Sequence, residues 1–300
     1  MKISRRQFVK AMAAMSAASM LAACGGNSGS GSSGGKKALT FQIWDVAQKE
    51  GMEAMCAAYT QQHPEVSIEV QVTSWNEYWT KLEAAATSNQ MPDIFWMHTN
   101  EILKYADNGM LADCSDIVEK DKFSEISLSN AMGSNGTLYA VPKDKDTVGL
   151  VYNKEMFDAA GVAYPDESWT WDDLVSASEK IYAATGKYGY MAYADDQLGY
   201  WNFVYQAGGY ILNEDKTKAG FTQPATEKAM KFYIGLQQND WCPDQTYFAE
   251  TAPGTAFFSE KGAMFLEGDW NILAELQNYP EMVGKWDVAV LPKCPDPESG

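Results

Sequence analysis

The sequence predicts an α/β fold of two lobes, and three observations favour it. Apolar, β-prone runs alternate with helix-forming stretches between residues 39 and 97, which indicates a mostly parallel sheet covered by helices. The alternation resumes after residue 147 and continues to residue 291. Finally, the roughly 260 residues that follow the first 37 can bury a sizeable core, and this length favours two lobes over one.

The first half is expected to run strand, helix, strand, helix, strand. The strands are predicted at 39–44, 66–72 and 92–97 because these runs are rich in apolar and β-prone residues. Ser74 and Glu77 have the spacing of a capping box, which predicts a helix from there to about residue 88. Between the first two strands, apolar residues at i, i+3, i+4 and i+7 predict an amphipathic helix that ends at His63-Pro64. Its apolar face consists of Met52, Met55, Cys56 and Tyr59.

The second half repeats this alternation. Thr170 is expected to cap a helix that reaches about residue 185, and Pro224 to lie in the first turn of a helix that reaches about residue 239. Short apolar strands are expected at 147–152, 188–193, 263–266 and 286–291.

Residues 1–23 are expected to be an export signal, because positive charges precede an apolar stretch too short to span a bilayer. Residues 21–24, Leu-Ala-Ala-Cys, resemble the bacterial lipobox, so Cys24 is expected to be lipidated and to anchor the chain to the cell membrane. Residues 4–10 resemble the twin-arginine export consensus; the alternative is an ordinary secretory signal with adjacent arginines. Residues 24–37 are rich in glycine and serine and are predicted to be a flexible tether.

Charge and composition exclude several classes of partner and site. The net charge of the chain is −17, and removal of 1–23, with four positive side chains and no acid, leaves −17 − 4 = −21. Nucleic acid is therefore a poor partner. The cysteines beyond Cys24 have no zinc-like spacing, and with only two histidines we expect no metal site and no cofactor. Cys56 is expected to be a buried thiol, and the disulfide pairings of Cys56, Cys114, Cys242 and Cys294 stay open.

Several stretches resemble one known family in their order along the chain. The clearest are "NQMPDIFWMHTNEILKYADNGMLADCSDIV" at 89–118 and "LYAVPKDKDTVGLVYNKEMFDAAG" at 138–161, followed by "FFSEKGAMFLEGDWNI" at 257–272 and "WDVAVLPK" at 286–293. They resemble the extracellular solute-binding proteins of ABC importers, in the sugar-binding group that includes maltose-binding protein.

The resemblance implies a periplasmic-binding-protein type II fold, with two α/β lobes, a cleft between them and a hinge. It implies an N-terminal lobe of 38–147 plus 286–300 and a C-terminal lobe of 148–285. Chains of this family continue past the strand at 286–291, so we expect the 300 residues to lack a C-terminal part.

Aromatic and carboxylate side chains at strand ends are the candidate ligand contacts, since sugars offer apolar C–H faces and rings of hydroxyls. The carboxyl end of the first strand carries Trp44 and Asp45, where open α/β sheets place ligands. The resemblance adds Trp96 and Trp270 as stacking residues and Asp146 as a ligand carboxylate. The remaining candidates lie in matching loops: His98, Asn100, Asp144, Asp196, Trp201, Asn202 and Glu267.

Several candidates also have a structural alternative. Trp96 and Trp201 are equally compatible with a core position, Asp45 with capping of the next helix, and the loop carboxylates with simple solvation. Trp79 is expected to be a packing residue, and Trp75 has no assigned role.

The function implied by the resemblance is capture of a carbohydrate, a di- or oligosaccharide, by hinge closure and delivery to ABC permease subunits. We expect a lipid-anchored, extracytoplasmic monomer that is no enzyme, because nucleophile-elbow, HExxH and phosphate-loop motifs are absent from the sequence. Two alternatives stay open: a secreted glycoside-cleaving lipoprotein, and a ligand sensor for a membrane receptor.

Overall fold

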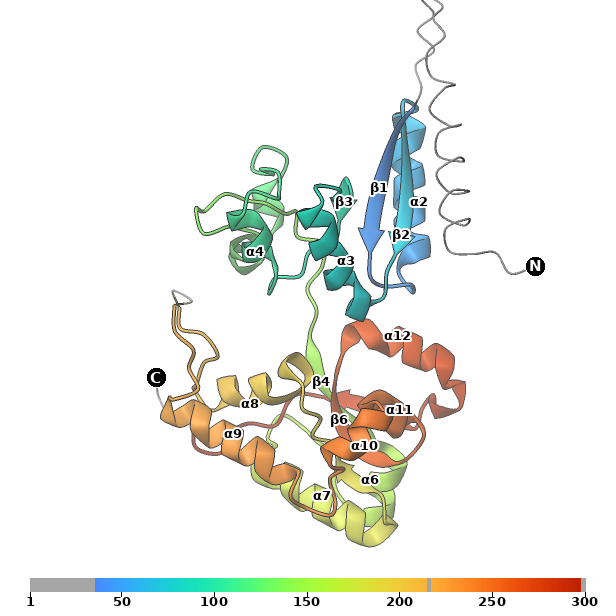
Figure 1. Cartoon of the computed structure of the whole chain (residues 1–300). Coiled ribbons are helices and arrows are strands. Elements are labelled where there is room, and N and C mark those ends of the chain that lie inside the picture. The colour runs from blue at the N-terminus through green and yellow to red at the C-terminus, as the bar shows by residue number, and fades with distance from the viewer. Residues whose placement is uncertain (1–35, 215–216, 298–300) are drawn as a thin grey trace, which may run out of the picture. The chain divides into compact units, whose positions relative to one another are not determined.

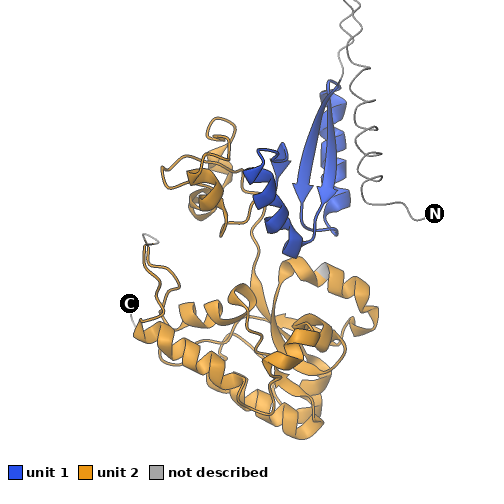
Figure 2. Ribbon diagram, viewed as in Figure 1, with its two compact units in different colours: residues 1–96 blue, residues 97–300 orange. Residues whose placement is uncertain are grey.

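The computed structural model describes residues 36–214 and 217–297. The chain divides into two compact units, unit 1 up to Trp96 and unit 2 from Met97 onward (Figure 2). The predicted export signal, Cys24 and nearly all of the predicted tether lie outside the described residues. Within the described part of the chain, no helix is both long and apolar enough to cross a membrane.

Unit 1 is a β-α-β-α-β unit with a three-stranded parallel sheet (Figure 1). Its elements are β1 (Lys37–Ile43), α2 (Lys49–Gln62), β2 (Val66–Val72), α3 (Trp75–Thr87) and β3 (Ile94–Phe95). The strand order is β2-β1-β3, with Lys37 opposite Val66 and Phe41 opposite Ile94. The predicted element order is confirmed, and the carboxyl ends of all three strands lie at one edge of the sheet.

The core of unit 1 is small. Ile43, Val70 and Trp96 form one buried cluster, against which Met52 and Cys56 pack only partly, and α3 adds the buried residues Tyr78 and Leu82. Helix α2 has no buried residue. The expectation that Cys56 is a buried thiol is therefore wrong: its side chain is half-buried, because a single thin sheet covers only part of the helix.

Unit 2 contains a four-stranded mixed sheet with strand order β5-β6-β4-β7. β5 (Tyr188–Tyr190) and β6 (Gly262–Gly268) are parallel, whereas β4 (Val148–Asn153) runs antiparallel to β6 and to β7 (Trp286–Ala289). Every residue of β6 is buried, so this strand lies at the centre of the unit. The helices of unit 2 are α4 (Ile102–Asp107), α5 (Glu125–Ser129), α6 (Lys154–Ala160), α7 (Trp171–Thr185), α8 (Trp201–Gln206), α9 (Pro224–Leu236), α10 (Gln245–Glu250), α11 (Pro253–Phe258) and α12 (Asp269–Asn278).

Local sequence signals explain where these helices begin and end. Thr170 caps α7 as predicted, in a capping box with Asp173, and Gly186 ends this helix in a left-handed conformation that glycine adopts readily. At α3 the predicted start is confirmed, but the Ser74 side chain makes no capping hydrogen bond, and Glu77 pairs with Lys81 at 2.9 Å instead.

The described units differ from the predicted lobe boundaries in two respects. The compact units divide at 96/97, whereas 147/148 was predicted. Residues 286–300 were predicted to belong with the N-terminal lobe, but β7 pairs with β4 from Leu150 to Asn153, which places it in the sheet of unit 2. Among the described residues the four cysteines beyond the signal are free thiols; Cys56 and Cys114 are half-buried, and Cys242 and Cys294 are buried.

Candidate ligand-binding site

Five aromatic residues meet at the carboxyl edge of the unit 1 sheet. Trp44 and Trp96 directly follow β1 and β3, and the first turns of α3, which follows β2, supply Trp75, Tyr78 and Trp79. The ring centroid of Trp44 lies 5.0 Å from that of Trp96 and 5.2 Å from those of Trp75 and of Tyr78. Trp79 lies 5.3 Å from Trp75 and 5.8 Å from Trp44. We call this set the aromatic cluster.

The aromatic cluster runs from the core to the surface. Trp96 is 6% exposed. Its backbone carbonyl accepts a 2.7 Å hydrogen bond from the Tyr78 hydroxyl, which holds the residue after β3 against α3. Trp44 and Trp79 are half-buried, whereas Trp75 is 43% exposed. The geometry thus favours the core alternative for most of the Trp96 ring and offers stacking surface on its neighbours.

Asp45 closes the turn that leads from β1 into α2. Its carboxylate accepts hydrogen bonds from the Ala47 N–H at 2.8 Å and from Gln48 Nε2 at 2.9 Å. The cap position of α2 is Gln48 and not Asp45. A carboxylate oxygen has room for more than one donor, so these bonds leave capacity for a ligand hydroxyl.

His98 and Asn100 begin unit 2. The Asn100 backbone N–H donates to His98 Nδ1 at 3.2 Å, and burial lowers the pKa of the His98 imidazole. His98 is therefore neutral at pH 7 and offers hydrogen bonds without a charge.

The loop before β4 is joined to the start of α12. The Thr147 N–H donates to Asp269 Oδ1 at 3.2 Å, and the Asp269 N–H donates to the Thr147 carbonyl at 3.1 Å. The reason is that Val148 and Gly268 are opposite each other in the antiparallel pair of β4 and β6. Partial burial, with the charges of Asp144 and Asp269, raises the pKa of Asp146, and Lys143 forms an ion pair with Asp144.

A recess of about 210 Å³ lies at the carboxyl end of β6, and the Glu267 carboxylate, 6% exposed, lines it. Glu267 Oε1 accepts hydrogen bonds from the Gly268 N–H at 2.8 Å and from Asn271 Nδ2 at 2.9 Å. A Cβ at Gly254 would lie 3.0 Å from Glu275 Oε1 and 3.5 Å from Glu267 Oε2, so both carboxylates border this glycine. Burial raises the pKa of Glu267 and of Glu275. Within the described ranges, no three His, Cys, Asp or Glu side chains are arranged to hold a metal ion.

The Trp270 ring packs against Gly268, the last residue of β6. A Cβ at Gly268 would collide with the Trp270 ring, so the half-buried indole folds back over the backbone of its own helix start. The Gly-x-Trp spacing therefore fixes the ring position by close packing.

The remaining candidates lie in the segment that leads into α8. The Asp195 carboxylate accepts from the Leu198 N–H and the Asp196 carboxylate from the Gln197 N–H, both at 2.7 Å. Asn202 Nδ2 donates to the Gln197 carbonyl at 2.8 Å. Trp201 is half-buried, and its Nε1 has no hydrogen-bond acceptor among the described residues.

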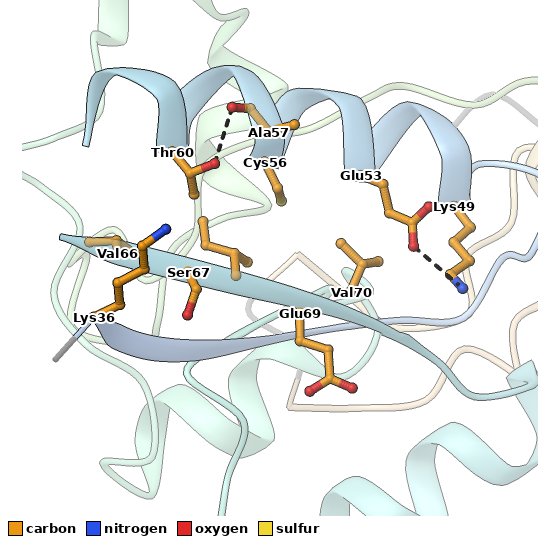
Figure 3. A pocket seen from close by; sticks show the side chains of 11 residues that line it. Lys36, Lys49, Glu53, Cys56, Ala57, Thr60, Val66, Ser67, Glu69 and Val70 are labelled. Carbon is orange, nitrogen blue, oxygen red and sulfur yellow. Dashed lines mark hydrogen bonds and ion pairs between the residues drawn. The ribbon is translucent and has the colours of Figure 1, made fainter. Parts of the chain in front are cut away.

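A larger groove of about 550 Å³ lies elsewhere in unit 1, between α2 and β2 (Figure 3). An ion pair of 3.4 Å between Lys49 and Glu53 lies on its helical wall, together with Cys56. Lys36 and Val66, at the amino ends of the strands, also line it, and none of the predicted ligand residues does. This groove is open to solvent and brings together no convergent polar groups, so we do not assign it as the ligand site.

The family described as bacterial extracellular solute-binding protein matches residues 44–298 of this chain. The chain belongs to this family. Relatives of this solute-binding protein include the lactose-binding protein of Rhizobium radiobacter and the diacetylchitobiose binding protein DasA of Streptomyces coelicolor, each 26% identical. The matches cover 85% and 87% of this chain but only 61% and 64% of those relatives, so the chain spans less than two thirds of their length.

Solved structures confirm the expected fold class for this solute-binding protein. The ABC substrate-binding protein Lmo0181 from Listeria monocytogenes, in complex with cycloalternan, has a TM-score of 0.76 at 26% identity, covering 87% of this chain and 68% of that chain. The cyclic α-maltosyl-1,6-maltose binding protein from Arthrobacter globiformis has a TM-score of 0.71 at 27% identity, covering 88% and 68%. The family is extracellular, in agreement with the expected location outside the cytoplasm.

Sequence reasoning missed part of what lies next to the predicted site residues. Asn271 lies in the first turn of α12 and donates to Glu267, near the end of β6, so no helical spacing within one element pointed to this contact. Glu275 and Gly254 reach the recess from positions that only the folded chain brings together. Trp75 had no predicted role, and it belongs to the aromatic cluster together with Trp79, whose half-buried ring packs on its neighbours as predicted.

Proposed function

We propose that this protein captures a carbohydrate, a di- or oligosaccharide, outside the cell and delivers it to the permease subunits of an ABC importer. The observation that carries the proposal is the start of α12, where a buried carboxylate, a side-chain amide and an indole lie within five residues: Glu267, Asn271 and Trp270. Carboxylate and amide groups bind sugar hydroxyls, and a flat indole packs on the C–H face of a pyranose.

The predicted contacts complement a neutral, hydroxyl-rich ligand. Trp44, Asp45, Trp96, His98 and Asn100 supply apolar rings and hydrogen-bonding groups, and unit 2 supplies carboxylates at Asp144, Asp146 and Asp196 together with Trp201 and Asn202. The only arginines of the chain are Arg5 and Arg6, within the predicted export signal. A ligand with a phosphate or carboxylate would meet several carboxylates and no guanidinium, which disfavours its binding.

Capture follows from conformational selection: a ligand that contacts both lobes stabilises the closed state by its extra contacts there. No bond of the ligand is broken, so the carboxylates act only as hydrogen-bond acceptors. Lipidation of Cys24 holds the monomeric protein at the membrane, near its permease. The relatives named for lactose and diacetylchitobiose binding support the ligand class.

A thermal-shift and tryptophan-fluorescence titration of the mature protein tests this proposal. The panel contains lactose, diacetylchitobiose, maltotriose and arabinooligosaccharides, with a uronic acid and a sugar phosphate as anionic controls. We expect a saturable rise in melting temperature with one neutral saccharide class, because a ligand that binds only the native state stabilises it by mass action. Breakdown of the sugar over hours would contradict the non-enzymatic proposal, and no response across the panel would contradict carbohydrate capture.

Two site variants and one control variant locate the site in the same assay. Trp270→Ala removes the indole and is expected to weaken binding by about tenfold or more. Tyr205→Ala, at an exposed aromatic of α8, is the matched control and is expected to bind as the wild type does. Asp146→Asn is expected to lower affinity; a hydrolase would instead keep affinity and lose turnover.

A further inference from the structure

The exposed end of the aromatic cluster has no role among the predicted ligand contacts. All ten tryptophans of the chain lie in the described ranges, and Trp75, at 43% exposed, is the most exposed of them. A single exposed aromatic is ordinary on a protein surface, so what favours a ligand position is how the Trp75 ring is held and where it lies in the sheet.

The orientation of the Trp75 ring is fixed by its neighbours. Its plane is 82° from that of Trp44 and 86° from that of Trp79, at centroid distances of 5.2 Å and 5.3 Å. These are edge-to-face contacts, the geometry that aromatic pairs prefer. Trp44 in turn contacts buried Trp96, so the exposed ring is connected to the core of unit 1 through a continuous set of rings. A ring held in this way loses little side-chain entropy when a ligand packs on it.

The position within the sheet also favours a ligand. Trp75 begins α3 directly after β2, at the carboxyl edge of a parallel sheet, where α/β folds bind ligands. Tyr59, another exposed aromatic of unit 1, lies in the last turn of α2, which returns the chain to the amino edge where β2 begins. The two residues have similar exposure, 43% and 49%, at opposite edges of one sheet.

We propose that Trp75, held by Trp44 and Trp79, is a stacking position for a pyranose ring of the ligand. The inference rests on the proposed function and adds a specificity-determining residue to it. The apolar C–H face of the sugar packs on the indole, and sugars whose axial hydroxyls interrupt that face are discriminated against.

The test compares Trp75→Ala, Trp75→Phe and Tyr59→Ala by isothermal titration with the saccharide that the wild type binds. We expect Trp75→Ala to weaken binding by about tenfold, Trp75→Phe by only about threefold because a flat ring remains, and Tyr59→Ala to bind as the wild type does. Melting of the ligand-free variants is the second readout. Loss of the two edge-to-face contacts is expected to lower the melting temperature of the free protein by a few degrees at most, whereas loss of a residue that packs in the core lowers it further.

The outcomes separate the two proposals. If the wild type binds a saccharide and Trp75→Ala binds it equally well, the stacking role is overturned while carbohydrate capture stands. If Trp75→Ala lowers the melting temperature by more than about 5 °C and affinity is unchanged, Trp75 is a packing residue. If the wild type binds no saccharide of the panel, both proposals fail together.

Discussion

Helices α2 of unit 1 and α7 of unit 2 have apolar faces with the same spacing and lie in very different surroundings. On α7, Leu174, Ala177, Ser178 and Ile181 stand at i, i+3, i+4 and i+7, and all four are buried. On α2, Met52, Met55, Cys56 and Tyr59 have this spacing and none is buried; Met55 is 65% exposed. Periodicity therefore predicts a helix and its apolar face, but not how much of the fold covers that face.

The physical reason is the number of elements that pack against each helix. α7 lies on β5 so closely that a Cβ at Gly189 would collide with the backbone of Ser178, and a large buried cluster surrounds it. α2 packs against one face of a three-stranded sheet, over a single cluster of three buried residues, Ile43, Val70 and Trp96. Stabilisation by burial is proportional to the apolar area removed from water, so packing stabilises α7 far more than α2.

The largest expected effect tests this difference directly. Ile181→Ala removes a fully buried side chain from α7 and is expected to lower the free energy of unfolding by about 2–5 kcal/mol. Met55→Ala on α2 is the matched control, with an expected change within about 0.5 kcal/mol. Urea unfolding of both variants measures the free energies. A comparable loss for Met55→Ala would contradict the exposed environment of α2 in solution.

The second expected effect concerns helix starts, where the two units again differ. Thr170→Ala removes a side chain that accepts a hydrogen bond from Asp173 and is expected to destabilise the protein by about 1 kcal/mol. Ser74→Ala, at a helix start with no side-chain capping bond, is expected to change stability by only a few tenths of a kcal/mol. Equal losses in urea unfolding would show that Ser74 caps α3 in solution.

These two comparisons also show how far the sequence predicts the molecule. The capping sequences at 74–77 and 170–173 both marked a helix start correctly, but only Thr170 makes the side-chain bond. At 74–77 the Glu77 N–H donates to the Ser74 carbonyl, and the Glu77 carboxylate pairs with Lys81. The family resemblance made Trp96 and Trp270 stacking candidates, but it does not reveal that the Trp96 ring is mostly buried. The recess at Glu267 depends on Gly254 and Glu275, which reach it through tertiary packing, so no local pattern predicts it.

Glu267 gives a third prediction, in which stability and binding change in opposite directions. Its folded pKa is raised by burial, so its contribution to stability is complete below the unfolded value, about 4.3, and is lost as pH rises through the folded pKa. Glu267→Gln keeps an acceptor for Gly268 and Asn271 and cannot ionise. We expect this variant to melt above the wild type at pH 7, with a flatter pH dependence, and to bind the saccharide more weakly. If Glu267→Gln instead lowers the melting temperature at pH 7, burial of the Glu267 carboxylate does not cost the folded protein stability.

The smallest expected effect concerns Asp93 in unit 1, whose pKa is shifted in the direction opposite to that of Glu267. Asp93 Oδ2 accepts hydrogen bonds from the Thr40 N–H at 2.9 Å and from the Thr40 hydroxyl at 3.0 Å, and these bonds lower the pKa of Asp93. Its contribution is therefore present above the unfolded value, about 3.9, and is lost as pH falls through the folded pKa.

Asp93→Asn is expected to lower the melting temperature at pH 7 and to reduce the loss of stability on acidification. Glu267→Gln instead changes how stability varies with pH above the pKa that the Glu267 carboxyl has in the unfolded chain. Thr40→Val keeps the backbone donor and removes the hydroxyl, so its effect at pH 7 is expected to lie between those of the wild type and Asp93→Asn. Melting curves across the acid and neutral range measure all three variants. Because Asp93 is exposed, solvent screens its hydrogen bonds and the change is small, so a large loss would mean that Asp93 is covered in solution.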